Sequence, residues 1–63
     1  MPKTDVTVTL VGTDGNAFNV MGLVNRALLK AGHGDLVEEY QKAAMDGDYN
    51  HLLGVTMEYV NVE

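Results

Sequence analysis

The segment 16–31 constrains the fold most, because its apolar residues cover more of a helix surface than one small sheet can hide. A helical i, i+3, i+4, i+7 stripe is formed by Ala17, Val20, Met21, Val24, Ala27, Leu28 and Ala31. Phe18 and Leu29 flank this stripe with Gly22 between them, which widens the apolar arc to roughly 200°, against about 100° for an ordinary surface helix. We therefore expect this helix to contact more than its own sheet, with Gly22 allowing another backbone to approach closely.

The remaining segments predict one α+β domain over residues 1–63. Residues 5–11 alternate and are rich in β-branched side chains, which predicts a strand, and residues 12–15 carry turn chemistry. Asp35 and Asp48 are expected to cap a second and a third helix, and Gly32 to close the first. Val60 and Val62 indicate a last strand, with an open boundary to the third helix near residue 57. We predict the order β-α-α-α-β, as a two-stranded antiparallel ribbon packed with two to three helices.

Self-association is expected from the size of the chain. Its 63 residues contain no Cys, so neither a disulfide nor a thiolate metal site supports the small core. Small domains of this kind often gain stability by assembling, and a two-stranded ribbon leaves open edges. We predict a homo-oligomer whose interface includes Phe18, Gly22, Leu29 and Tyr59. The methionines at 21, 45 and 57 are expected mostly to fill the core.

Charge and hydropathy narrow the partners and the location. Nine acidic residues stand against four scattered basic ones, giving a formal net charge of −5, so nucleic-acid binding is not expected. No run approaches the roughly 20 apolar residues of a membrane span, and the first residues carry no basic-then-apolar signal pattern. We therefore expect a cytoplasmic protein that does not bind membranes.

The stretch GTDGNAF, residues 12–18, has two interpretations. As a ligand site, the loop residues Thr13, Asp14, Gly15 and Asn16 would precede a helix whose amide groups attract an anion such as phosphate. Phe18 or Tyr49 would offer a surface for a base, and Arg26 or Lys30 of a neighbouring subunit would supply countercharge. As a plain turn, the stretch only starts the helix, capped by Asp14 or Asn16. The lysine of a phosphate-binding P-loop is absent, which favours the plain turn.

Catalytic and metal chemistry find little support. The segment 46–51 imitates the opening of a calcium loop, but His51 stands where the bend needs Gly and Met57 where a bidentate Glu belongs. His51 either carries protons with Asp48 or holds its loop in place, and it remains a ligand-site candidate. Without Cys or Ser, and without zinc-like His spacing, we predict no enzyme, no metal and no cofactor.

Two stretches, VTLVGTDGNAFNVMGLVNRALLKAG and GDYNHLLGVTMEYV, carry a resemblance. They resemble small proteins of bacteriophages and prophage-bearing bacteria that share the pattern G-x-DGNAF followed by GDY-x-HLL. The resemblance implies no activity and no catalytic residues. It implies a setting, the cytoplasm of a bacterial host, in which accessory phage proteins modulate host machinery or host defence.

These observations predict a non-catalytic phage-type accessory protein that evades host defence. In the favoured interpretation, a homo-oligomer binds and sequesters a phosphorylated small molecule or nucleotide signal between its subunits. In the alternative, an acidic, tyrosine-bearing surface binds and inhibits a host protein.

Overall fold

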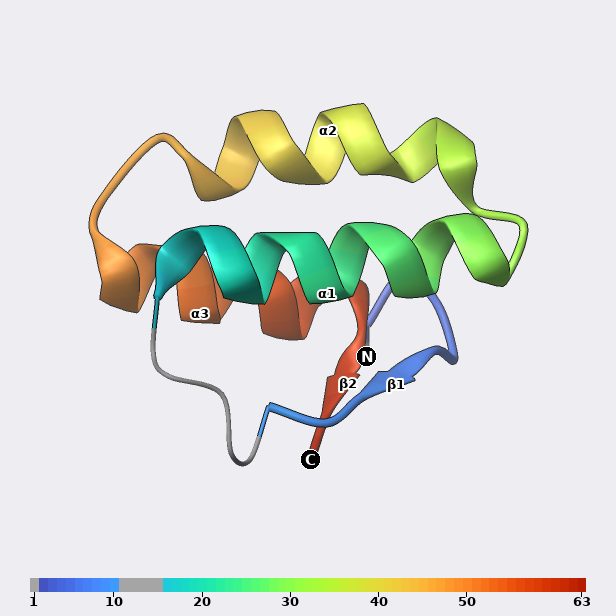
Figure 1. The fold of residues 1–63 in the computed structure, drawn as a ribbon. Helices are drawn as coiled ribbons and strands as arrows, with labels where there is room; N and C mark the ends of the chain where they lie inside the picture. Colours follow the sequence, from blue (N-terminus) through green and yellow to red (C-terminus); the bar gives the residue numbers. More distant parts are fainter. Residues whose placement is uncertain (1, 11–15) are drawn as a thin grey trace.

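The computed structural model describes residues 2–10 and 16–63, and three helices pack on a short two-stranded sheet (Figure 1). The elements in chain order are β1 (Thr7–Val8), α1 (Ala17–Lys30), α2 (Gly34–Ala44), α3 (Tyr49–Tyr59) and β2 (Asn61–Val62). Helix α2 lies against both α1 and α3, and α1 lies over β1. The α+β class and the order β-α-α-α-β are therefore confirmed, and α3 extends to Tyr59 before the last strand begins.

The sheet is parallel, so the predicted antiparallel ribbon is wrong. Thr7 pairs with Asn61 and Val8 with Val62. The backbone bonds of the pair run from Asn61 N–H to Val6 O (2.8 Å), from Glu63 N–H to Val8 O (2.9 Å) and from Leu10 N–H to Glu63 O (3.0 Å). Hydrogen bonding between the two strands thus extends along most of the predicted strand 5–11.

The end of α3 explains the parallel direction. The backbone N–H groups of Lys3 and Thr4 donate to the carbonyls of Glu58 (2.8 Å) and Tyr59 (3.2 Å), and the Thr4 hydroxyl also donates to Tyr59 O (2.7 Å). The last turn of α3 is therefore fixed beside the start of β1, and the chain enters β2 from the same end. A parallel pair needs such a long crossover, which the three helices provide.

The core lies between the helices and the inner face of the sheet. Its buried apolar members are Val8, Val20, Met21, Val24, Leu28, Tyr40, Ala44, Leu52, Val55, Tyr59 and Val60. Thr56 is buried among them, where its hydroxyl lies 2.8 Å from the Leu52 carbonyl and 2.7 Å from the Tyr40 hydroxyl. Alternation along β1 holds as predicted, because Val8 is buried while Thr7 and Thr9 are exposed.

Three of the four residues predicted to begin or end helices do so, and one does not. Asn16 Oδ1 accepts from Phe18 N–H (2.8 Å), Asp48 Oδ1 accepts from His51 N–H (2.9 Å), and Gly32 has a φ of 85° after α1. Asp35 is not the N-cap, because α2 already begins at Gly34 and Asp35 is its second residue. The N-cap position is His33, whose side chain makes no capping bond. Asp35 instead lies in the first turn, where a carboxylate suits the helix dipole.

Candidate functional site

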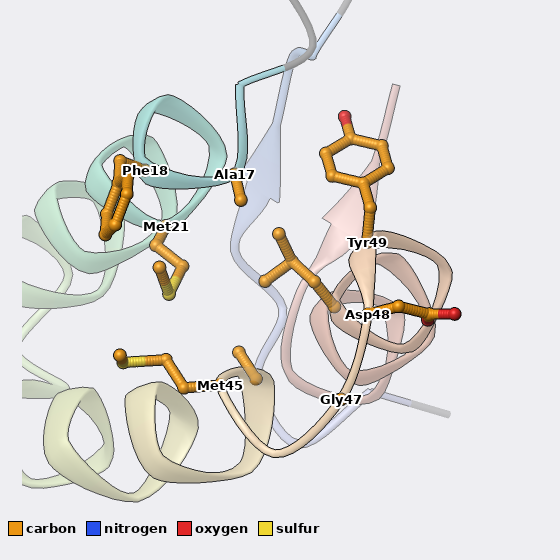
Figure 2. Close-up of a pocket in the computed structure, with 9 residues that line it drawn as sticks. Ala17, Phe18, Met21, Met45, Gly47, Asp48 and Tyr49 are labelled. Atoms are coloured by element: carbon orange, nitrogen blue, oxygen red, sulfur yellow. The ribbon is translucent and has the colours of Figure 1, made fainter.

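The two halves of the sequence pattern meet at one end of the molecule. Ala17 and Phe18 begin α1, while Gly47 and Asp48 lie in the turn between α2 and α3 and Tyr49 begins α3 (Figure 2). They border a hollow of about 220 Å³, which we call the corner hollow and whose remaining lining residues are Met21, Ala44, Met45 and Leu52. Residues about thirty positions apart in the sequence thus share one surface because α2 brings the chain back along α1.

The corner hollow is apolar. Its rim carries three large exposed side chains, Phe18 (74% exposed), Met45 (62%) and Tyr49 (37%), whereas Met21 and Leu52 are buried beneath. Asp48 is the only charged residue among the described residues that line it. The hollow therefore suits an apolar or aromatic group, and its single charge repels a phosphate.

The GTDGNAF loop is described only from Asn16 onward. Thr13, Asp14 and Gly15 lie outside the described residues, so their role as ligand contacts stays a prediction. Asn16 caps α1 through its bond to Phe18 N–H, as the plain-turn interpretation expects. One of the first amide groups of α1 is therefore already satisfied by the chain itself.

His51 holds the turn between α2 and α3. Its Nε2–H donates to the Ala43 carbonyl at 2.8 Å, and its backbone N–H is bonded to Asp48. A Cβ added at Gly47 would lie 2.7 Å from Cγ and 2.8 Å from Cβ of His51, so the imidazole leaves room only for glycine there. His51 does not line the corner hollow. The sequence GDY-x-HLL thus encodes a tight corner between two helices.

Arg26 lies apart from the other ligand candidates. It borders a different hollow, with Thr7, Thr9 and Lys30, on the flank of α1 that faces β1. Within one chain, Arg26 therefore does not join Phe18 and Tyr49. The prediction that it supplies countercharge requires a neighbouring subunit.

Three of the four predicted interface residues lie on one exposed side of α1. Phe18 and Leu29 are 74% and 61% exposed, and Gly22 between them is exposed with no atom within 4 Å of an added Cβ. The part of the chain that the structure describes therefore leaves the apolar flank of α1 exposed.

Tyr59 corrects the prediction, because it belongs to the core and not to an open interface. It is only 5% exposed, and its ring packs edge to face on the Tyr40 ring, with 5.4 Å between the ring centroids. Its hydroxyl donates to Glu39 Oε2 (2.6 Å), and Lys3 Nζ lies 4.9 Å above the ring and 2.9 Å from the same Glu39 oxygen. The last turn of α3 packs inward on α2, which removes Tyr59 from the surface.

The Lys3–Glu39–Tyr59 cluster shifts the titration of its members. The hydrogen bond from Tyr59, then that from Lys3, lowers the pKa of Glu39 below its ordinary value. Burial, then the bond to Glu39, raises the pKa of Tyr59. The bond to Glu39 and its charge raise the pKa of Lys3. The cluster fixes the N-terminal segment to α2 and α3. No local pattern in the sequence predicts it, because its three residues come from distant segments.

The methionines depart from their predicted role. Met21 is buried, but Met45 and Met57 are 62% and 59% exposed, so these two do not fill the core. Met45 directly follows α2, where the chain turns and leaves its side chain at the rim of the corner hollow. A methionine just before the pair Asp46-Gly47 was the available signal for this exposure.

Comparisons with known proteins give no further assignment. No family model matches the chain, and no curated protein and no solved structure matches it significantly. Among the described residues, no three His, Cys, Asp or Glu side chains are placed to hold a metal ion. No helix within 2–10 and 16–63 is long and apolar enough to cross a bilayer. The resemblance to small phage proteins therefore stays a prediction.

Proposed function

We propose that the chain is a non-catalytic binding protein whose corner hollow seats an apolar side chain of a partner protein. The supporting observation is the ring of exposed Phe18, Met45 and Tyr49 around a buried floor. Exposed apolar groups gathered around a concave site mark binding surfaces, and methionine and tyrosine adapt well to such contacts. In the bacterial setting that the resemblance implies, the partner is a host protein and the outcome is inhibition or modulation.

Matched surface variants test this function. Tagged protein is used to capture partners from bacterial cells, and the bound polypeptides are compared among Phe18→Ser, Tyr49→Ser and Met57→Ser. Met57 is a control of equal character, because it is 59% exposed on α3 and does not line the hollow. We expect one polypeptide that Met57→Ser retains and the other two variants lose. A partner that all three variants retain, or that Met57→Ser also loses, contradicts the proposal.

A second candidate is sequestration of a nucleotide-like ligand. Phe18 and Tyr49 both border the hollow, and two aromatic rings suit a base. The phosphate of such a ligand would need cations from another subunit, since Arg26 lies elsewhere in the same chain. Isothermal titration with a panel of nucleotides tests this candidate, and absence of heat across the panel contradicts it.

Self-association is the remaining part of the proposal, and α1 offers a self-complementary surface for it. Phe18 and Leu29 lie equally far from the midpoint between Gly22 and Asn25. Two α1 helices that pack antiparallel about this midpoint would oppose Phe18 to Leu29 and Gly22 to Asn25, as a two-fold interface requires. Asn25 Oδ1 is buried and has no hydrogen-bond partner among the described residues, so a donor of the second copy would reach it only after the Asn25 side chain rotates outward.

Phe18 borders both this interface and the corner hollow, so the solution mass of variants at residues that the two surfaces do not share separates them. Light scattering at micromolar concentration is expected to give a multiple of 6.8 kDa for the native chain and for Tyr49→Ser. Leu29→Ser, which removes an apolar contact outside the hollow, is expected to give 6.8 kDa. A native mass of 6.8 kDa would refute self-association while leaving the capture experiment untouched.

A further inference from the structure

Among residues 2–10 and 16–63, no strand pairs with the outer edge of β1, which lies beside a groove. Val6 O, Val8 O and Leu10 N–H are the groups that bond to β2. Because backbone groups of successive residues in a strand alternate between its two edges, those of Thr7 and Thr9 point away from β2. Both residues are exposed, and a hollow of about 230 Å³ separates them from the flank of α1. A strand could enter there and bond to Thr7 and Thr9.

Two cations border the same groove. Of the four basic residues, Lys3 pairs with Glu39 and Lys42 pairs with Glu38. Arg26 and Lys30, one helical turn apart, have no carboxylate partner among the described residues, and both line the groove. The floor is apolar, formed by Val8, Leu23 and Ala27. On a chain with a net charge of −5, this is a local concentration of positive charge.

We propose that the β1 groove binds an extended acidic peptide segment of another protein by strand addition. Main-chain bonds to Thr7 and Thr9 would supply a sequence-independent part of the affinity, and carboxylates facing Arg26 and Lys30 would set the preference. A second copy of β1 is a poor occupant, because edge-to-edge pairing of two copies would bring the Arg26 and Lys30 pairs together. The groove shares no lining residue with the corner hollow, so this site is separate from the function proposed above.

A titration followed by nuclear magnetic resonance tests the proposal with defined probes. The ligand is a ten-residue peptide in which Glu and Val alternate, and the comparison peptides carry Gln or Lys in place of Glu. We expect the acidic peptide to shift the amide signals of Thr7 and Thr9 and to protect both amides from exchange. The Lys peptide is expected not to bind, and the affinity for the acidic peptide should fall with salt.

Variants separate charge from strand pairing. Arg26→Gln combined with Lys30→Gln is expected to weaken binding about three- to tenfold, as two exposed ion pairs allow. Thr9→Pro removes an outward N–H and is expected to reduce binding with Arg26 and Lys30 intact, provided its circular dichroism matches the native protein. Lys42→Gln, a paired surface lysine elsewhere, is the matched control and should leave binding unchanged.

Three outcomes would overturn the proposal. Equal binding of the Gln and Glu peptides would remove the role of charge. An effect of Lys42→Gln as large as that of the Arg26/Lys30 double variant would show a general charge effect. Equal binding of a single-stranded oligonucleotide of the same charge, without protection of the Thr7 and Thr9 amides, would show an anion site and not a strand site. If Thr9→Pro does not fold, the amide protection in the native protein decides the strand pairing alone.

Discussion

Replacement of Gly47 by Ala is the sharpest test of the corner between α2 and α3. The added Cβ would lie 2.8 Å from the Cβ of His51 and 2.7 Å from its Cγ. The positions of both Cβ atoms are fixed by the backbone, so a change of the His51 rotamer cannot relieve the contact between them. Overpacking of this kind costs about 1–3 kcal/mol of unfolding free energy. We expect Gly47→Ala to lower stability by that amount.

The same substitution should reverse its sign when His51 is absent. His51→Gly removes both the Cβ and the ring that an added Cβ at Gly47 would contact. It should cost about 0.5–1.5 kcal/mol for the lost bond to the Ala43 carbonyl and about 1 kcal/mol more for glycine within a helix. In that background the contact with the imidazole is gone, and Gly47 does not have a positive φ. Gly47→Ala should then stabilise by about 0.4–1 kcal/mol, because alanine reduces the freedom of the unfolded chain.

Urea unfolding followed by circular dichroism measures all four proteins of this cycle. The slopes of the transitions should agree, so that the differences report the native state. An equal cost of Gly47→Ala in both backgrounds, or no cost in either, would refute the steric explanation. The occurrence of Gly and His in the GDY-x-HLL pattern would then need an explanation other than the packing of this turn.

Four further substitutions test individual hydrogen bonds and, at Gly32, the backbone conformation. The Thr56 hydroxyl donates its proton to Leu52 O, so in the Tyr40–Thr56 bond the Tyr40 hydroxyl is the donor. Thr56→Val leaves that buried donor without a partner and should cost about 1–3 kcal/mol of unfolding free energy in urea. Tyr40→Phe removes the donor itself and should cost only about 0.5–1.5 kcal/mol. The folded pKa of Glu39 lies below its ordinary value of 4.5, so its contribution is present above that pH and is lost as pH falls through the folded pKa. Acid titration of stability should therefore show a smaller loss in Glu39→Gln. Gly32→Ala, at a φ of 85°, should lower the thermal midpoint through a cost of about 1–2 kcal/mol.

Local signals predicted the elements well, because the forces that define them act over a few residues. The stripe of α1, the caps Asn16 and Asp48, and the left-handed Gly32 all depend on neighbours within a turn or two. The direction of the sheet depends on where α3 ends relative to β1. That position is set by bonds from Lys3 and Thr4 to residues more than fifty positions away, and no local pattern contains it.

Two residues of the corner hollow were named from the sequence, but neither its other lining residues nor its arrangement was predicted. Phe18 and Tyr49 were singled out, and the structure brings both to one hollow. Arg26 was assigned to the site from a neighbouring subunit, and within one chain it lies on the other flank of α1, so that assignment stays a prediction. Met45 was missed because a methionine after an apolar helix end is expected to be buried, whereas here the chain has already turned away from the core.

Some residues near the corner hollow are needed by the fold, and others are not. Gly47, Asp48 and His51 each make a contact that the turn needs, so their place in the sequence pattern requires no ligand. Phe18 and Met45 expose most of their surface beside the same turn, where polar residues would favour solubility and cost the core nothing. Departures from such local preferences are expected at functional sites. The unexplained pair therefore identifies the corner hollow as the place to search for a partner, and the turn behind it as the support that holds its shape.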